Sequence, residues 1–393
     1  MPDPSPPGAG PLTGVTVLDL SAVGPASRCT RLLADYGATV VKVAPVPGRG
    51  PEQSAPPPWT YAAGRGTRRA RIDVRHPEGR DALLALARRA DVFVESFRPG
   101  VADRLGIGYE DVRRENPAIV YVSTSGYGSA GPRSGWAGHD LDYLAVGGFL
   151  AMCEPTGDGR PPLPGATIAD AAAGGMQAAI AVCATLLRRA ATGEGARLDV
   201  SVADGVLWLM SLSLEEHLAT GSPVRRGHDV LSGRYACYGT YAAGDGRFLA
   251  VAAIEPKFFA NLCRALDCPE WADKQYDDDC QQALRAALAA AFARRPRDSW
   301  VEELAGADTC VAPVLDVDEV AADSHFAGRG SFVEGELPSG DRLLQVGAVL
   351  AGMAPLPQPV PLPGDTTDTE ALLVAAGVPA ESVTSLLDSG VVA

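Results

Sequence analysis

Apolar strand-like segments alternate with helical segments in the N-terminal part of the sequence, and this alternation limits the fold more than any other feature. Strands are predicted over residues 15–20, 39–43, 70–74, 91–97 and 119–123, with helices between most of them. Helical connections of this kind join parallel strands, because antiparallel neighbours need only a short turn. The pattern therefore predicts an α/β fold with a doubly wound parallel sheet. Such sheets bind ligands beyond the carboxyl ends of their strands.

The pattern changes in the second half of the chain. After a mainly helical stretch with one more strand near residues 197–202, an Ala-Gly-Asp-Gly turn signal at residues 243–246 predicts a hairpin. Helices and a further strand follow, so we expect residues 225–330 to form a smaller α+β domain. A proline-rich stretch, residues 355–363, is predicted to act as a linker before two short C-terminal helices.

Charge and cysteine content exclude several classes of function. The chain has 48 acidic against 34 basic residues and a net charge of −14, which argues against nucleic-acid binding because phosphates need a basic face. The eight cysteines form no Cys-x-x-Cys pair and show no metal-ligand spacing, which is typical of reduced thiols in a cytoplasmic protein. The N-terminal segment lacks the features of a secretory signal and is expected to be a disordered tail.

The longest apolar stretch, residues 171–187, is rich in small residues and contains Gly174 and Gly175. It is short for a membrane span, so we predict a buried helix and no membrane association. No P-loop, G-x-G-x-x-G, G-x-S-x-G or H-E-x-x-H motif occurs, which disfavours nucleotide hydrolysis, dinucleotide binding, α/β-hydrolase activity and zinc-protease activity. A glycine- and arginine-rich loop at residues 64–69 is suited to phosphate, although this signal alone is unspecific.

Three titratable residues stand at positions suited to a catalytic group. His139 lies at a loop-to-helix junction, where the positive end of the helix disfavours the imidazolium and leaves a neutral imidazole available as a base. Asp170 precedes the apolar helix, and Glu255 ends an apolar strand directly before Pro256. From the residues alone, each also has an ordinary structural interpretation. These are a surface cap for His139, a helix N-cap for Asp170 and a helix-start carboxylate for Glu255.

Short motifs spread along the chain, each unspecific alone, occur together in one known family. In chain order they are Leu12-Thr13-Gly14, Leu33-Ala34-Asp35-Tyr36-Gly37-Ala38, Arg98-Pro99-Gly100-Val101, Ser125-Gly126-Tyr127-Gly128, Gly138-His139-Asp140, Ala169-Asp170 with Gly174-Gly175, Ala252-Ala253-Ile254-Glu255-Pro256, Thr309-Cys310-Val311-Ala312-Pro313-Val314 and Arg329-Gly330-Ser331-Phe332. Their order and spacing resemble the α-methylacyl-CoA racemase branch of the family III CoA-transferases, the CaiB/BaiF family. The resemblance covers most of the chain.

This resemblance implies an interlocked homodimer in which each chain has a large Rossmann-like domain with a parallel sheet and a smaller α+β domain. The expected boundaries are a disordered tail over residues 1–11, the first part of the large domain over 12–220, the small domain over 225–330, and a return segment over 331–393. The return segment would complete the large domain.

The resemblance also implies the reaction. Transferases of this family use the aspartate that matches Asp170 as a nucleophile, whereas racemases combine it with the residues that match His139 and Glu255. Racemising a 2-methylacyl thioester removes the α-proton and returns one to the other face, which needs two opposed acid/base groups. His139 and Asp170 would serve the two faces of an enolate, and Glu255 would orient His139. Tyr238 and Asp140 match positions that line the site.

Matching family positions also indicate where CoA binds. The contacts expected for its nucleotide end are Lys42, Arg71, Ile72, Asp73, Val74 and Arg104. The contacts expected for pantetheine and the thioester are Gly138, Leu141 and Tyr143. CoA is part of the substrate, so no cofactor or metal is expected. The expected partners are an acyl-CoA thioester and a second copy of the chain, without nucleic acid or membrane.

Three departures from the racemase pattern leave the acyl group and its carrier open. Ala44-Pro45 stand where racemases have an acidic residue and a phosphate-binding arginine, so Arg49 or Arg68 would have to replace the latter. Ala166 replaces an asparagine, and residues 234–237 are bulkier than usual. An unusual acyl group or a carrier-protein thioester would fit these changes. A CoA-transferase using Asp170, a related thioester isomerase and a non-catalytic acyl-CoA-binding protein are the other functions considered.

Overall fold

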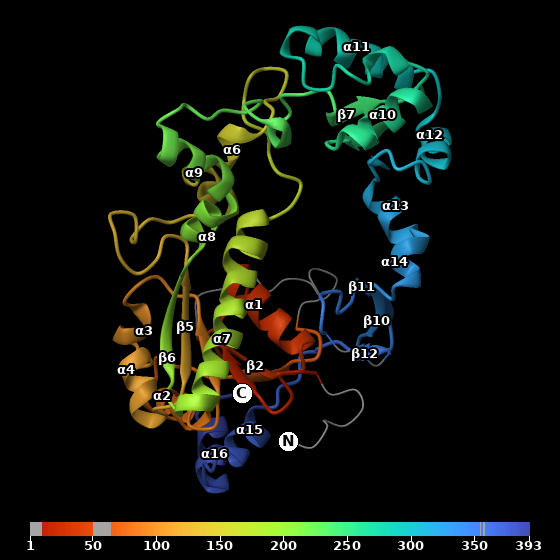
Figure 1. Cartoon of the computed structure of the whole chain (residues 1–393). Coiled ribbons are helices and arrows are strands. Elements are labelled where there is room, and N and C mark those ends of the chain that lie inside the picture. Colours follow the sequence, from red (N-terminus) through yellow and green to blue (C-terminus); the bar gives the residue numbers. More distant parts are fainter. Residues whose placement is uncertain (1–9, 50–63, 354, 357) are drawn as a thin grey trace. The chain divides into compact units, whose positions relative to one another are not determined.

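The computed structural model describes residues 10–49, 64–353, 355–356 and 358–393 (Figure 1). Two units make up the chain, and each is described by itself. Unit 1 comprises Met1–Phe149, Leu163–Ser211 and His325–Ala393, and unit 2 comprises Leu150–Pro162 and Leu212–Ser324. Most of the predicted disordered tail, residues 1–9, lies outside the described residues.

Unit 1 is built around a six-stranded parallel sheet with the strand order β3-β2-β1-β4-β5-β6. The strands are β1 (Thr16–Asp19), β2 (Thr39–Ala44), β3 (Arg68–Arg71), β4 (Val92–Glu95), β5 (Val120–Ser125) and β6 (Ala196–Ser201). This is the order of Rossmann-like doubly wound folds, so the predicted fold class is confirmed. The central strands are buried on both faces, which explains their nearly continuous apolar sequences.

Helices cover both faces of the sheet. On one face, α1 (Gly24–Asp35) and α7 (Gln177–Thr192) share a core with Val17 of β1. The helices of the other face are α2 (Pro77–Ala87), α4 (Tyr109–Glu115), α15 (Thr369–Ala375) and α16 (Ala380–Asp388), which share a core with Leu18. Neighbouring residues of a strand point to opposite faces, so β1 contributes to both cores.

The C-terminal part of the chain contributes a second, smaller sheet to unit 1. Its strands are β10 (Phe332–Glu336), β11 (Arg342–Val346) and β12 (Val360–Pro361), in the order β11-β10-β12. β12 pairs in parallel with β10, so the proline-rich stretch at residues 355–363 is not only a linker but contains a short edge strand. An edge position suits Pro361, because proline cannot donate a ladder hydrogen bond.

A buried arginine ties this smaller sheet to α1. Arg65 is 1% exposed, forms an ion pair with Asp35 (3.3 Å) and donates a hydrogen bond to the carbonyl oxygen of Val346 (2.7 Å). Arg31 on α1 also pairs with Asp35 and donates to the carbonyl oxygen of Arg65 (2.7 Å). Arg65 therefore stabilises the fold and is not accessible to a phosphate, whereas phosphate binding by the other residues of the loop 64–69 stays a prediction.

Unit 2 is an α+β structure. Its antiparallel sheet has the order β7-β8-β9, formed by β7 (Tyr238–Ala242), β8 (Phe248–Ala252) and β9 (Val311–Pro313). The helices that share its core are α10 (Pro256–Ala265), α11 (Gln281–Phe292) and α12 (Arg297–Leu304). Phe259, Leu288 and Trp300 are buried where these helices meet the sheet.

Short helices complete the two units. They are α3 (Val101–Arg104), α5 (Asp140–Val146), α6 (Phe149–Met152), η1 (Ala169–Met176), α8 (Val202–Leu209), α9 (Ser211–Thr220), α13 (Val317–Ala322) and α14 (Ser324–Gly328), with single turns η2 (Val230–Ser232), η3 (Pro269–Trp271) and η4 (Asp278–Cys280). Among them, η1 is a π-helix that continues directly into α7.

By length and composition alone, one helix of the described residues, Ala169–Thr192, is apolar enough to cross a membrane. It combines η1 and α7. Its inner face, with Ala178, Val182 and Leu186, packs into the core beneath the sheet of unit 1, as the core helix of a globular domain does. The prediction of a buried helix therefore holds only for this inner face, since Ile180 and Leu187 on the outer face are exposed.

Candidate active site

The sheet of unit 1 reverses its strand order between β1 and β4, and ligands of doubly wound folds bind outside this point. β1 leads into α1, which begins at Gly24, and β4 leads into the loop that carries Arg98. The segment η1 packs against α1, and a Cβ on Gly24 would lie 4.0 Å from Oδ2 of Asp170. Asp170 therefore lies near the start of the helix that follows β1.

Glycines allow α1 and α8 to pack closely against η1. A Cβ on Gly175 would lie only 2.8 Å from the Cβ of Arg28 on α1. On another side, a Cβ on Gly205 of α8 would clash with the carbonyl oxygen of Ala173. π-Helical turns are rare and occur often at functional sites. The small residues thus fix the segment that presents Asp170.

Asp170 is the second residue of η1, so its side chain is not the helix N-cap considered from the sequence. The N-cap residue is Ile168, and the N–H of Asp170 donates a hydrogen bond to Oδ1 of Asp140 (2.8 Å). Burial raises the pKa of Asp170, and the negative charge of Asp140 raises it further, while Arg28 and His139 oppose this effect. Asp170 therefore holds a proton more readily than an exposed aspartate.

His139 immediately precedes α5. Its N–H donates a hydrogen bond to Oδ2 of Asp142 (2.9 Å), and its carbonyl oxygen accepts one from the N–H of Asp142 (2.9 Å). These reciprocal bonds fix the backbone at the start of α5 and leave the residue exposed. The next residue, Asp140, accepts the N–H of Asp170, so the start of α5 lies beside the start of η1. His139, Asp140 and Asp170 thus lie together in unit 1.

Tyr143 supports the loop that carries His139. Its ring is buried against Gly126, where a Cβ would clash with it, and its hydroxyl donates a hydrogen bond to the carbonyl oxygen of Gly138 (2.5 Å). Burial, followed by the charge of Asp170, raises the pKa of Tyr143 to about 12, so the hydroxyl stays protonated and remains a donor. Leu141, the third residue expected to meet pantetheine, is exposed.

Two of the positively charged residues expected to contact CoA differ in their surroundings. Nζ of Lys42 lies 2.5 Å from Asp19 and 2.9 Å from the hydroxyl of Ser27, so this ammonium group is held inside unit 1. Arg104 ends α3 and is exposed. Of the two, Arg104 is the one accessible to a phosphate.

The segment expected to hold the nucleotide end of CoA, residues 71–74, lies beside the C-terminus. The N–H of Ala393 donates to the carbonyl oxygen of Arg71 (3.1 Å), and the N–H of Asp73 donates to the carbonyl oxygen of Val391 (2.9 Å). Ile72 is buried in the core, and the neighbouring Val74 packs against it. Their side chains therefore serve the fold, and a contact with CoA would fall to the half-buried Arg71 and Asp73.

The arginines expected to compensate for Ala44-Pro45 both lie beside carboxylates. Arg49 is 4.0 Å from Asp73, and Arg68 is 3.5 Å from Asp368. Both guanidinium groups are partly exposed. Ion pairs at such exposed positions are weak, so either arginine can exchange its carboxylate for a phosphate at little cost.

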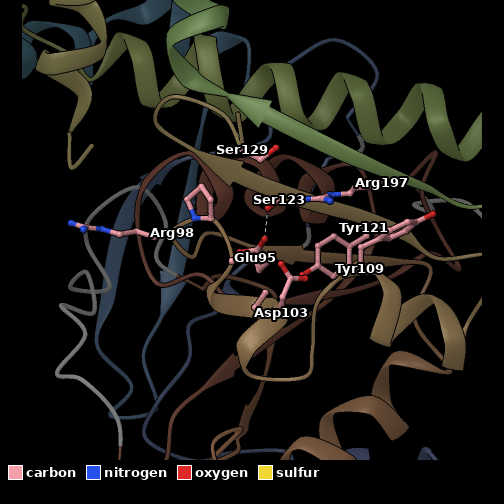
Figure 2. A pocket seen from close by; sticks show the side chains of 11 residues that line it. Glu95, Arg98, Asp103, Tyr109, Tyr121, Ser123, Ser129 and Arg197 are labelled. Atoms are coloured by element: carbon pink, nitrogen blue, oxygen red, sulfur yellow. Dashed lines mark hydrogen bonds between the residues drawn. The ribbon is translucent and has the colours of Figure 1, made fainter. Parts of the chain in front are cut away.

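A polar cavity of about 260 Å³ lies at the carboxyl ends of β4 and β5, with Glu95 near its centre and Arg98 at its rim (Figure 2). Glu95 is 3% exposed and accepts hydrogen bonds from the hydroxyl of Ser123 and from the N–H of Phe97 (2.7 Å). Burial raises the pKa of Glu95, and these hydrogen bonds oppose the rise. Sequence reasoning missed this residue, although it ends an apolar strand as Glu255 does.

Glu255 and Tyr238 belong to unit 2. Glu255 is exposed directly before α10, and its carbonyl oxygen accepts a hydrogen bond from the N–H of Phe259 (3.1 Å). Its carboxylate does not cap the helix. Tyr238 is the first residue of β7 and pairs with Ala252. The catalytic roles assigned to Glu255 and Tyr238 from the sequence stay predictions.

The bulky segment 234–237 is held within unit 2. Arg234 forms an ion pair with Asp278 (2.7 Å), and Tyr235 packs edge-on against Tyr276 with their ring centroids 5.0 Å apart. The next two residues are fully buried in the core of the unit. The charged and bulky side chains that distinguish this segment from racemases therefore contact other residues of unit 2.

The side chains gathered in unit 1 suit proton transfer. An imidazole can serve as a base, and a carboxyl group whose pKa burial raises can serve as an acid. Among the residues that the structure describes, no group of three or more His, Cys, Asp or Glu side chains is placed to hold a metal ion. Four of the cysteines, Cys29, Cys237, Cys263 and Cys268, are buried.

A Rossmann-ordered sheet with an acid/base pair at its switch point is the framework of an α/β enzyme. The model of CoA-transferase family III matches residues 12–367, so the chain belongs to this family, whose members act on acyl-CoA thioesters.

Named relatives include both racemases and transferases. The chain is 35% identical to the alpha-methylacyl-CoA racemase of Homo sapiens over 327 residues, 83% of each chain, which confirms the resemblance to the racemase branch. It is 32% identical to the acetyl-CoA:oxalate CoA-transferase of Acetobacter aceti over 344 residues, 83% of this chain and 86% of the relative. A solved CaiB/BaiF family protein from Brucella suis has a TM-score of 0.76 and 26% identity, covering 94% of this chain and all of that one.

Proposed function

We propose that the protein is a racemase or epimerase of 2-methylacyl-CoA, or other 2-substituted acyl-CoA, thioesters that works by 1,1-proton transfer through an enolate. The observation that carries this proposal is the hydrogen bond from the N–H of Asp170 to Oδ1 of Asp140 (2.8 Å), because it holds the residue that follows His139 beside Asp170 in unit 1. One acid/base group suffices for a nucleophilic transfer, whereas inversion at carbon needs two.

In the proposed reaction, the imidazole of His139 removes the proton from C2, and the electron pair of the C–H bond moves into the thioester to form the enolate. The carboxyl group of Asp170 then gives its proton to the opposite face of C2, which inverts the centre. For the other enantiomer the two groups exchange roles. The raised pKa of Asp170 supports its part as a proton donor. No step calls for a cofactor, since CoA is carried by the substrate.

Asp140 supports this chemistry from beside Asp170. It accepts the N–H of Asp170, and its charge favours the protonated form of that carboxyl group. In this proposal Glu255 has the role predicted from the sequence, which is to orient His139. Tyr238 is likewise proposed to line the site. For CoA itself, Arg104 is the favoured phosphate contact because it is exposed.

We also propose that the active form is a homodimer in the cytoplasm. The outer face of α7 exposes Ile180 (70%) and Leu187 (76%), seven residues apart on one helix face. Exposed apolar stripes of this kind mark interaction surfaces, and the family resemblance indicates a second copy as the partner. The scattered cysteines, without a Cys-x-x-Cys pair, are in keeping with a reducing compartment.

The test of the proposed reaction is exchange of the α-proton. Purified protein is incubated with (2R)- and (2S)-2-methylacyl-CoA in D₂O, and deuterium at C2 is followed by mass spectrometry. We expect exchange from both substrates and a loss of at least about 100-fold in His139→Ala, Asp170→Ala and Glu255→Gln. His76→Ala and Asp158→Asn, at exposed sites away from the proposed chemistry, should exchange like the wild type. Absence of exchange despite intact binding of the CoA ester would overturn the proposal.

A CoA-transferase is the second candidate, because relatives with that activity share the fold and Asp170 can serve as a nucleophile. In that reaction Asp170 would attack the thioester, release CoA thiolate and form a mixed anhydride. Dependence on a carboxylate acceptor, ping-pong kinetics and trapping of Asp170 by hydroxylamine would identify it. Tight CoA-ester binding with neither activity would indicate a non-catalytic acyl-CoA-binding protein. Double-bond migration would indicate a related isomerase.

A further inference from the structure

We propose that Arg28 is a positioning residue for Asp170: it fixes the turn that leads into η1 and places a positive charge beside the Asp170 carboxylate. The inference deepens the proposed racemase function and rests on it where activity is concerned. It concerns a residue of α1 that neither the sequence motifs nor the proposed mechanism assigned.

Arg28 reaches the Asp170 segment at two points. Its Nη2 donates a hydrogen bond to the hydroxyl of Thr167 (2.6 Å), three residues before Asp170. Its Cβ lies against Gly175, where a side chain would be only 2.8 Å away. The arginine therefore contacts the chain on both sides of Asp170. A shorter or apolar residue at this position would leave Thr167 without this donor.

The charges around Asp170 come from three directions. From α5 and the residue before it come Asp140 and His139, together with the neutral hydroxyl of Tyr143, and from α1 comes Arg28. The third helix packed on η1, α8, carries one charged residue, Asp204, which is exposed.

Burial and Asp140 favour the protonated form of Asp170, and Arg28 favours the carboxylate. A residue that must both give and accept the C2 proton needs both forms within reach near neutral pH. Without Arg28, burial and the charge of Asp140 would keep Asp170 protonated. Asp170 would then accept a proton less readily, and this loss would appear first at low pH. Arg28 therefore balances the raised pKa and keeps Asp170 competent in both directions.

The experiment compares Arg28→Met, Arg28→Gln and Arg28→Lys with the wild type, and Arg89→Met on an exposed helix end serves as the matched control. The first readout is the pH dependence of kcat/KM for α-proton exchange. For the two neutral variants we expect kcat/KM at pH 5, relative to pH 7, to fall about fivefold to tenfold below the wild-type ratio. Arg28→Lys should recover most of the ratio, since it keeps the charge, and Arg89→Met should not change it.

A second readout does not depend on activity. The side-chain carboxyl carbon of Asp170, labelled with ¹³C and assigned by its absence in Asp170→Asn, is titrated by NMR. Its midpoint should move to higher pH in both neutral variants and stay near the wild-type value in Arg28→Lys.

These two readouts separate the inference from the proposed function. If the wild type exchanges no α-proton, the racemase proposal fails while the titration still decides the role of Arg28. If the titration and the pH profile of both folded neutral variants match the wild type, the role of Arg28 is overturned. Circular dichroism identifies a variant that does not fold. If one of the two neutral variants fails to fold, the other is compared with the wild type.

Discussion

Asp140 influences Asp170 in two ways, by a hydrogen bond and by its negative charge, and a single substitution can separate the two. Its Oδ1 accepts the N–H of Asp170, and its negative charge raises the pKa of that residue. Asp140→Asn keeps an acceptor oxygen and removes the charge, so the pKa of Asp170 should fall. As the pH is lowered, the variant should therefore lose exchange activity later than the wild type. At pH 5 it should retain a fraction of its maximal kcat/KM that is roughly threefold larger than the fraction retained by the wild type.

The pH profile of kcat/KM for α-proton exchange measures this effect, with Asp158→Asn as an exposed control. Asp140→Asn should move the acid side of the profile opposite to Arg28→Met, because the two side chains carry opposite charges. A shift in the same direction in both variants would show that they disturb the site by loss of structure rather than by charge.

Glu95 gives a prediction for stability rather than activity. Because burial raises its pKa in the folded protein, its stabilising contribution is complete below the unfolded pKa and is lost as pH rises through the folded pKa. Glu95→Gln preserves partners for Ser123 and the N–H of Phe97 but stays neutral. The free energy of unfolding of the wild type, minus that of the variant, should therefore fall as pH rises above about 4, the pKa of an ordinary glutamate.

Urea unfolding at several pH values tests this. Glu110→Gln, at an exposed position on α4, is the matched control and should show no such trend. A difference that grows as pH rises would mean that the folded protein favours the ionised form of Glu95, contrary to the effect of burial.

At the scale of single residues, local patterns single out candidate residues but do not show which side chains are buried. His139 and Asp170 stood out because each sits at the start of a helix in a recognisable motif, and their catalytic roles stay predictions, although a hydrogen bond joins Asp170 to Asp140, the residue after His139. Arg65 looked like a phosphate ligand but is buried against Asp35. Its partners lie 30 and 281 residues away in the sequence, and no local pattern reveals such a contact.

The elements that hold Asp170 depend on close helix packing. Gly205 of α8 lies against the carbonyl of Ala173, so Gly205→Ala must push α8 away from η1. We expect a loss of about 1–3 kcal/mol in the free energy of unfolding, as for other overpacked cores. Exchange activity should fall as well, because η1 carries Asp170.

Thermal or urea unfolding measures the loss, and α-proton exchange measures the effect on the site. Gly135→Ala is the matched control, because a Cβ there has no neighbour within 4 Å and the residue does not require a positive φ. Full stability and activity in Gly205→Ala would show that α8 and η1 separate freely and that their packing does not position Asp170.

The central parallel strands β1, β4 and β5 could be predicted from the sequence because they are apolar runs that are largely buried. The smaller sheet of unit 1 could not. β12 is only two residues long and lies within a proline-rich stretch, where composition indicates a linker. Its pairing with β10 depends on a contact between segments about 25 residues apart, where Gly335 pairs with Val360. Likewise, the π-helical form of η1 follows from its packing against α1 and α8, which composition does not record.

For the whole molecule, the exposed apolar stripe on α7 is the surface on which the proposed homodimer can be tested. If it is the dimer surface, replacing Leu187 or Ile180 by glutamate buries a charge at the interface and should favour the monomer. Light scattering should then report a mass near 40.7 kDa for the variants and about twice that value for the wild type. Val374→Glu, which adds the same charge to an exposed position on α15, should leave the mass unchanged.

Activity measured on the same samples separates two consequences of this surface. Loss of exchange activity together with the dimer would mean that the site is complete only in the pair of chains, although Leu187 and Ile180 lie outside the proposed proton-transfer chemistry. Retained activity in a monomer would mean that His139, Asp170 and the other groups of one chain suffice. A wild type that is already monomeric would contradict the proposed dimer, and the apolar face of α7 would then need another partner, since stripes this exposed are uncommon on monomers.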